Sequence, residues 1–244
     1  MRARTKAPSG NLSEPPCIHG EKSESGRSWG CRSVAGVPYR LSFTTGGLLV
    51  NESAAVAGLL LSEGDASRAW SVAVDRNVVQ QRVRRSTVRL TSEAVQRLAV
   101  LPRAGLRIVA DGPGAQSRIL LWIAACARYR LLRDFGREVL RDRLLTERPL
   151  IEPDDFETFW DVQSAWVDAL RDAAPSTRVK LRQTTFRMVR DAGFVEGDGR
   201  VVAAALAPDS AQVISALDPS LVLSLPLHEG QLAGIGAEMG VRRD

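Results

Sequence analysis

The chain has 244 residues, of which 44% are hydrophobic, 25% are charged and only 5% are aromatic. This composition is ordinary for a globular protein with a buried core, and a core built mostly from Leu, Val, Ala and Ile suits helices better than an all-β sandwich. Three cysteines are too few for a disulfide scaffold.

The net charge of +5 is concentrated at the N-terminus. Residues 1–40 contain seven Lys or Arg and three Asp or Glu, whereas the other 204 residues contain 26 basic and 25 acidic side chains. The overall charge therefore gives little support to nucleic-acid binding, and a binding site has to be sought in local clusters.

The sequence indicates a cytoplasmic protein without a membrane span. Its longest apolar run, residues 119–127, has nine residues, and a span needs roughly 18. The N-terminus has basic residues but no apolar run behind them, so no signal peptide is predicted.

The first half of the chain is predicted to hold a tail followed by several helices. Residues 1–38 are rich in Ser, Gly, Pro and charge and are predicted to be a disordered basic tail. Order is expected from Tyr39. The periodicity predicts helices over 47–62, 66–74, 76–89 and 91–101, with Asp65 as an N-cap. A loop is expected from Pro102 to Gly114, with residues 106–110 extended.

A core helix over 115–133 and an amphipathic helix over 134–145 are predicted next. Pro149 and Pro153 mark a boundary within 146–153. The predicted organisation is therefore the tail, a helical domain over 39–148 and a winged-helix-like domain over 149–244.

After this boundary the expected order is a helix over 154–173, a turn, and a helix from about 177 to 193. A short strand, a glycine-rich turn over 196–199 and a strand over 200–206 follow, and then a helix over 209–217 and a strand over 221–225. Helix, turn, helix and hairpin is the order of a winged helix-turn-helix. In such a unit the second helix enters the major groove and the hairpin, or wing, touches the sugar-phosphate backbone, so both are expected to contact DNA. The predicted fold is mainly α, with an N-terminal multi-helix domain and a C-terminal winged helix-turn-helix-like domain that carries a small β-hairpin.

The second helix of this unit is the candidate recognition helix. Five basic residues and no acid lie between 176 and 190. At about 100° per residue, its apolar side chains fall on one side of the helix. The opposite side is predicted to hold Lys180, Gln183, Thr184, Arg187, Arg190 and Asp191. Arg178 and Arg182 flank the apolar arc, and these positions suit contacts with the DNA backbone. Gln pairs with adenine, Arg and Lys pair with guanine, and Thr and Lys hold phosphates, so this face suits double-stranded DNA.

Two other interpretations of this helix stay open. A basic exposed face is often simply solvated, and a helix-turn-helix can serve as a protein-docking module. The second possibility makes the chain an adaptor that binds other proteins.

A second basic cluster lies upstream. Residues 76–107 contain eight arginines and one acid, Glu93. On a continuous helix Arg82, Arg85 and Arg89 form one stripe, which suits the DNA backbone. Alternatively, these arginines pair with residues 151–172, which contain seven acids and one Arg.

Catalytic and metal sites are not predicted. The two histidines, His19 and His228, are far apart, and no phosphate-binding loop or nucleophile motif occurs. Cys17, His19 and Cys31 offer three ligands without a standard zinc spacing. Cys126 is predicted to be a small core residue. A non-enzymatic protein without cofactors is expected.

Parts of the sequence resemble a known family. The stretch YRLSFTTGGLL at 39–49, Glu52-Ser53 and the leucines at 59–61 resemble the opening of the BrxA proteins of BREX (bacteriophage exclusion) systems. Asn77 with the arginines after it, residues 122–132 followed by Phe135, and residues 176–193 are similar as well. The resemblance covers about 39–206 and leaves the tail outside.

The resemblance implies a helical, non-catalytic protein that binds double-stranded DNA. It also implies that other BREX proteins, namely a methyltransferase, an ATPase and a phosphatase-like component, are partners. The family has carried the label of an antitermination-like factor, which keeps RNA as an alternative ligand. It has also carried an inner-membrane label, which the short apolar runs of this chain contradict.

Overall fold

The computed structural model describes residues 39–43, 46–146 and 149–238. These residues are mainly helical, as predicted. In the first half they form α1 (Val50–Glu63), α2 (Ala66–Asp75), α3 (Arg84–Leu98), α4 (Arg103–Ala110) and α5 (Ala115–Arg128). They continue as α6 (Arg130–Phe135), the π-helix η1 (Gly136–Leu140), α7 (Arg141–Leu145), α8 (Pro153–Ser164), α9 (Asp168–Arg171), α10 (Pro175–Asp191), α11 (Pro208–Leu217), the 3₁₀-helix η2 (Pro219–Ser224) and α12 (Glu229–Glu238).

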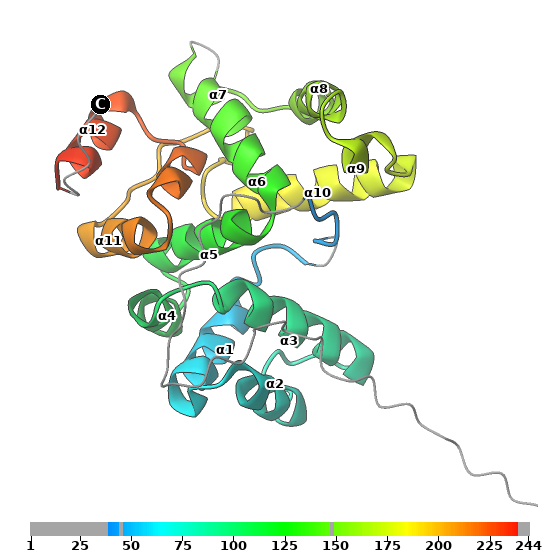
Figure 1. Cartoon of the computed structure of the whole chain (residues 1–244), viewed down its shortest axis with the longest axis vertical. Helices are drawn as coiled ribbons and strands as arrows, with labels where there is room; N and C mark the ends of the chain where they lie inside the picture. The colour runs from blue at the N-terminus through cyan, green and yellow to red at the C-terminus, as the bar shows by residue number, and fades with distance from the viewer. Residues whose placement is uncertain (1–38, 44–45, 147–148, 239–244) are drawn as a thin grey trace, which may run out of the picture.

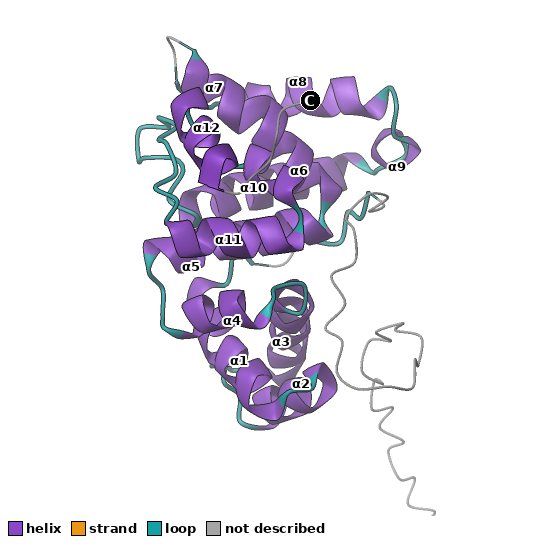
Figure 2. Ribbon diagram, turned by 60° about the vertical axis from the view of Figure 1, so that its left-hand side comes forward, coloured by secondary structure: helices purple, strands orange, loops and turns teal. Residues whose placement is uncertain are grey.

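Helices α1 to α4 form one group, and the helices from α6 onward form a second group on the other side of α5 (Figures 1 and 2). The buried side chains nevertheless make one continuous cluster, which extends from Phe43 to Leu227. The division into domains over 39–148 and 149–244 stays a prediction.

Helix α5 is the centre of the molecule. Every residue of its apolar run 119–127 is buried, and the helix contacts α3, α4, α6, α11 and η2. A helix that is apolar on all sides has to be enclosed by other elements. The prediction of a buried core helix is confirmed, as is the burial of Cys126.

The predicted single helix over 115–133 is wrong because the chain breaks at Tyr129. This residue has φ −119° and ψ 102°, which is extended backbone. Its ring packs against Phe43, with 5.0 Å between the ring centroids, and its hydroxyl donates to Glu93 at 2.6 Å. These contacts with distant segments override the helical periodicity.

The chain then passes through the π-helix η1, where Gly136 allows a close approach. A Cβ at Gly136 would overlap the backbone carbonyl of Ser224 in η2. That carbonyl also accepts a hydrogen bond from Trp122 Nε1 at 3.0 Å. The predicted strand over 221–225 is wrong, because residues 219–224 form the 3₁₀-helix η2, which Asp218 caps at its N-terminus. Leu221 and Val222 are buried within this helix.

Two predictions upstream also need correction. The expected helices over 76–89 and 91–101 are replaced by a loop over 76–83 and the single helix α3. The Asn77 carboxamide organises this loop, because its oxygen accepts from the Gln81 amide and from the Thr87 hydroxyl, each at 3.0 Å. Residues 106–110, expected to be extended, lie in α4, where Leu106 and Val109 face the core.

Other elements agree closely with the sequence. α1, α2 and α11 lie near their predicted bounds. The Asp65 side chain accepts a hydrogen bond from the Arg68 backbone amide at 2.8 Å, so it caps α2 as predicted.

The helix expected over 154–173 is divided into α8 and α9. Val167 is extended between them, and Leu170 of α9 is buried in the core. After α10, a positive φ at Gly193 reverses the chain. Residues 194–202 then form a tight hairpin with an antiparallel bridge between Val195 and Val201. In the described residues the predicted strands do not extend beyond isolated bridges. Arg200 bridges to Leu150, and the Ala204 amide bonds to the Pro226 carbonyl. The winged-helix assignment stays a prediction.

Candidate nucleic-acid interface

Helix α10 has one buried side and one basic exposed side. Leu181, Thr185, Met188 and Val189 are buried. The exposed side carries four long polar residues, which follow one another at spacings of three or four: Lys180, Gln183, Arg187 and Arg190. We call these four residues the α10 basic face.

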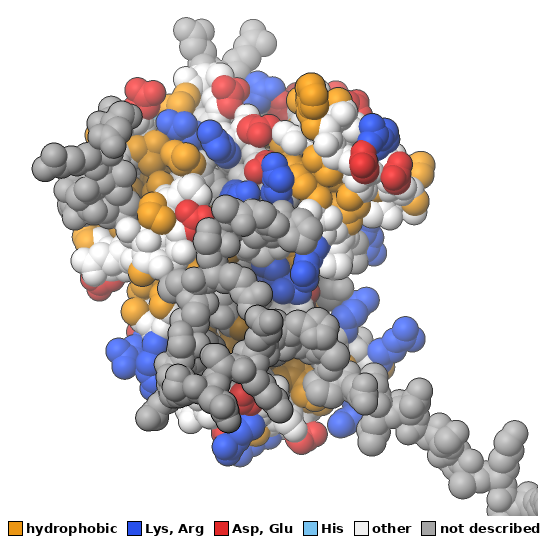
Figure 3. Space-filling model, in the orientation of Figure 1, with side chains coloured by type: hydrophobic (Ala, Val, Ile, Leu, Met, Phe, Trp, Pro, Cys, Tyr) orange, Lys and Arg blue, Asp and Glu red, His pale blue; other side chains and the backbone are white. Residues whose placement is uncertain are grey.

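None of the basic side chains of this face forms an ion pair with another described residue. Figure 3 shows Lys and Arg side chains on the right of the molecule, between the levels of α10 and α3. Its donors project from one helix, an arrangement that suits groove or phosphate contacts.

Thr184 does not lie where the helical projection placed it. Its side chain is buried, and its hydroxyl donates to the Lys180 carbonyl at 2.9 Å. A threonine can satisfy its own hydroxyl in this way within a helix, so polarity alone assigned it to the wrong side. Asp191 is also half-buried and does not belong to the exposed face.

Arg178 and Arg182 face α8 and are bound there. Arg178 pairs with Glu157 at 2.5 Å and with Asp161 at 2.7 Å, and Arg182 pairs with Glu157 at 2.5 Å. Burial alone would lower the pKa of Arg178, but its hydrogen bonds and charge contacts with Asp161 and Glu157 outweigh burial and raise it. The Arg178 guanidinium also lies over the Trp160 ring. Both arginines join α10 to α8 instead of projecting to solvent.

The C-terminal end of α10 is fixed to the core from two directions. Arg118 of α5 donates to the Asp191 carbonyl at 2.8 Å. The Asp191 carboxylate accepts from the Leu48 amide at 2.9 Å. Neither Arg118 nor Leu48 was a candidate in the sequence, because both contacts join distant parts of the chain.

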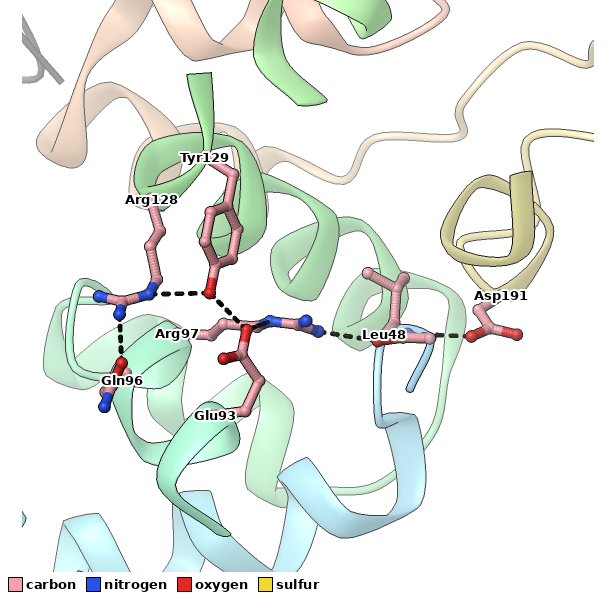
Figure 4. A network of polar contacts seen from close by, with 8 residues as sticks. Leu48, Glu93, Gln96, Arg97, Arg128, Tyr129 and Asp191 are labelled. Atoms are coloured by element: carbon pink, nitrogen blue, oxygen red, sulfur yellow. Dashed lines mark hydrogen bonds and ion pairs between the residues drawn. The ribbon is translucent and has the colours of Figure 1, made fainter. Parts of the chain in front are cut away.

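A buried polar network continues from this point to α3 and α5 (Figure 4). Arg97, which is 2% exposed, donates to the Gly47 carbonyl at 2.8 Å and pairs with Glu93 at 2.7 Å. Glu93 also accepts from the Tyr129 hydroxyl. Burial, with the charge of Glu93, raises the pKa of Tyr129 above its usual value. Through residues 47 and 48, the network connects the C-terminal end of α10 to α3 and α5.

The second predicted cluster is exposed but does not form the expected stripe. Arg82 lies in the loop before α3, whereas Arg85 and Arg89 lie one turn apart within α3. The alternative pairing with residues 151–172 is not found among the described residues. There the acids of 151–172 pair with other arginines, Arg143, Arg171, Arg178 and Arg182.

The hairpin after α10 differs in charge from a phosphate-binding wing. Its exposed tip carries Glu196 and Asp198, and Arg200 lies 3.8 Å from the Asp198 carboxylate. Acidic side chains repel phosphates, so this tip adds nothing to the basic face.

Metal binding and membrane insertion find no support in the described residues. No group of three or more His, Cys, Asp or Glu side chains is placed there to hold a metal ion. Cys17, His19 and Cys31 lie outside the described residues. No helix within the described part of the chain is long and apolar enough to cross a bilayer.

Comparison with known proteins identifies relatives. The BrxA family model matches residues 37–218. The BREX protein BrxA of Escherichia coli O9:H4 (strain HS) is 22% identical over 182 residues, which are 74% of this chain and 85% of that protein. The crystal structure of an uncharacterized protein from Magnetospirillum magneticum is similar with a TM-score of 0.64. It has 22% identity and covers 78% of this chain and 98% of the other, which shows a shared fold.

Proposed function

The chain belongs to the BrxA family, and from this membership together with the α10 basic face we propose that it is a non-enzymatic DNA-binding component of a BREX phage-defence system. The BREX assignment rests on the name of the E. coli relative. As such a component, the protein acts in the cytoplasm together with other BREX proteins. The resemblance implies that these are a methyltransferase, an ATPase and a phosphatase-like component.

The observation that carries the DNA proposal is the separation of the arginines of α10 into two sets. Arg178 and Arg182 are neutralised by α8, whereas Arg187 and Arg190 are exposed alongside Lys180 and Gln183. The basic residues can contact phosphates, and the Gln183 amide can reach a base edge in the major groove. The rigid attachment of α10 lowers the entropy lost on binding.

Duplex DNA is favoured over the other nucleic acids. The major groove of B-form DNA admits a helix, whereas the deep, narrow groove of double-stranded RNA does not. Binding of single strands relies on aromatic stacking platforms, and the α10 basic face contains no aromatic residue. The acidic hairpin tip leads us to assign DNA contact to α10 without the wing.

Fluorescence anisotropy of labelled nucleic acids at several salt concentrations tests this proposal. The protein should prefer duplex DNA to single-stranded DNA and to duplex RNA, with a steep negative salt slope. Lys180→Glu with Arg187→Glu should weaken duplex binding by about 10- to 100-fold and reduce the slope by about two.

The matched control reverses the same number of charges on α4, where Arg103 and Arg107 are exposed. Arg103→Glu with Arg107→Glu should change affinity by less than about threefold, because it alters only the long-range field. Equal weakening by both double variants would mean that net charge, and not the α10 basic face, governs binding. A clear preference for RNA would favour the antitermination-like alternative.

A further inference from the structure

The turn between α8 and α9 exposes a large aromatic side chain. Trp166 is 86% exposed, and Val162, one helical turn before it, is 56% exposed. The other described tryptophans, Trp70, Trp122 and Trp160, are buried or half-buried. Exposing a tryptophan to water is unfavourable, and such side chains are enriched at the centres of protein interfaces.

Exposed acidic residues flank this tryptophan in the sequence. Asp161 and Asp168 are 68% and 81% exposed, and Asp172 is exposed as well. Arg171 pairs with Asp168, and Arg178 pairs with Asp161 from beneath, so the carboxylates are only partly neutralised. Figure 3 shows hydrophobic and acidic side chains together over α8 and α9, at the upper right. We call the surface formed by Asp161, Val162, Trp166, Asp168 and Asp172 the Trp166 face.

The Trp166 face and the α10 basic face point in different directions. On α10, Arg178 and Arg182 are directed toward α8. At 100° per residue, the mean direction of the α10 basic face is rotated by about 140° around the helix axis from the mean direction of Arg178 and Arg182. A ligand on the basic face therefore leaves the Trp166 face open.

We propose that the Trp166 face is a docking surface for a basic, amphipathic segment of a partner protein. Trp166 and Val162 supply the apolar contact, and the three carboxylates supply charge complementarity to Lys or Arg flanking an aliphatic or aromatic anchor. The inference deepens the proposal that the chain works with other defence proteins, and it does not depend on DNA binding.

The charge of the face decides among the possible occupants. A nucleic acid that stacked on Trp166 would bring its phosphates close to Asp161 and Asp168, which is unfavourable. A second copy of this face would bring like charges together. The basic residues 1–38 of the same chain satisfy the charge and contain one aromatic residue, Trp29, but no run of aliphatic residues. The experiment below distinguishes them from a partner protein.

Photo-crosslinking of the full chain in cells with the complete defence system tests the proposal. A benzophenone amino acid is placed at Ala169, which is exposed on α9 beside Trp166, so that Trp166 is retained. The expected adduct is another protein, joined through a Lys/Arg-rich segment that mass spectrometry identifies. Adding Trp166→Ala should reduce the adduct at least tenfold.

Adducts to residues 1–38, to a second copy of the chain or to nucleic acid would overturn the proposal. So would an adduct yield no greater than that from a benzophenone at exposed Val83, or an adduct yield that Trp166→Ala leaves unchanged. With the identified partner purified, Trp166→Ala should raise Kd at least tenfold, and Trp166→Phe should raise it less. Val83→Ala should leave Kd unchanged.

Duplex DNA binding by Trp166→Ala should equal that of the unaltered protein. Loss of the partner by Trp166→Ala with duplex binding retained supports the docking proposal. If the unaltered protein captures the partner but binds no duplex, the DNA proposal alone has failed, and if it binds duplex but captures no partner, the docking proposal alone has failed.

Discussion

The Asp191 carboxylate accepts a hydrogen bond from the Leu48 backbone amide at 2.9 Å, which joins residues 143 positions apart. Leu48 is buried, and the preceding Gly47 carbonyl is bound by Arg97. The contact therefore connects the end of α10 to the frame that holds α3. It makes the geometry of the α10 basic face dependent on a segment far from it in sequence.

Asp191→Ala should destabilise the protein by about 1–3 kcal/mol, because it leaves the buried Leu48 amide without its acceptor. Urea denaturation measures this free energy of unfolding. Asp142→Ala, at an exposed position of α7, is the control and should change stability by less than about 0.5 kcal/mol. Equal effects of the two substitutions would contradict an anchoring role for Asp191.

Two glycine substitutions should act in opposite directions. A Cβ at Gly47 would overlap the Asp191 carboxylate, whereas a Cβ at Gly58 in α1 would meet nothing within 4 Å. Gly47→Ala should therefore destabilise the fold by about 1–3 kcal/mol through overpacking. Gly58→Ala should stabilise it by about 0.5–1 kcal/mol through helix propensity. Thermal denaturation of both variants measures the difference, and stabilisation by both would show that the segment at Gly47 can shift freely.

Local patterns in the sequence predicted the helices that bury a regular apolar face. Periodicity placed α1, α10 and α11, and the nine-residue apolar run identified the centre of the core. Prediction failed where a distant partner determines the conformation. Tyr129 breaks a helical pattern because its ring and hydroxyl bind Phe43 and Glu93.

Glycines misled the interpretation of α4. The Pro- and Gly-containing stretch from Pro102 to Gly114 suggested a loop, but a Cβ at Gly105 would come within 2.9 Å of Val213 Cγ1 in α11. The residue permits close helix packing, and no local pattern shows this. In the same way, the projection of α10 located the basic face but could not reveal that Arg178 and Arg182 are paired with α8.

The exposure of Trp166 was not predicted, because the residue type alone does not show whether a tryptophan is buried. It sits where the predicted helix over 154–173 turned out to be divided, after Ser164 and before α9. Trp166 therefore lies outside both helices, and a helical projection of residues 154–173 could not predict whether its side chain is buried or exposed.

The buried pair of Arg97 and Glu93 should behave as a coupled unit. Arg97→Met leaves the Glu93 carboxylate without its cation and should cost about 3–5 kcal/mol. Adding Glu93→Gln removes the uncompensated charge, so the double variant should be more stable than the sum of the single effects predicts. A double-mutant cycle by urea denaturation should give a coupling of about 1–3 kcal/mol. Additive effects would show that the two groups contribute separately.

Arg85 and Arg89 should form a second DNA contact that acts independently of α10. Both are exposed, and neither forms an ion pair with another described residue. We expect Arg85→Glu with Arg89→Glu to weaken duplex binding by about tenfold and to reduce the salt slope by about one to two. Because the two pairs of side chains lie on different helices and share no ion pair, the effect should add to that of Lys180→Glu with Arg187→Glu in free energy. If the α3 variant binds normally while the α10 variant does not, the arginines of α3 are simply solvated and the DNA contact is confined to α10.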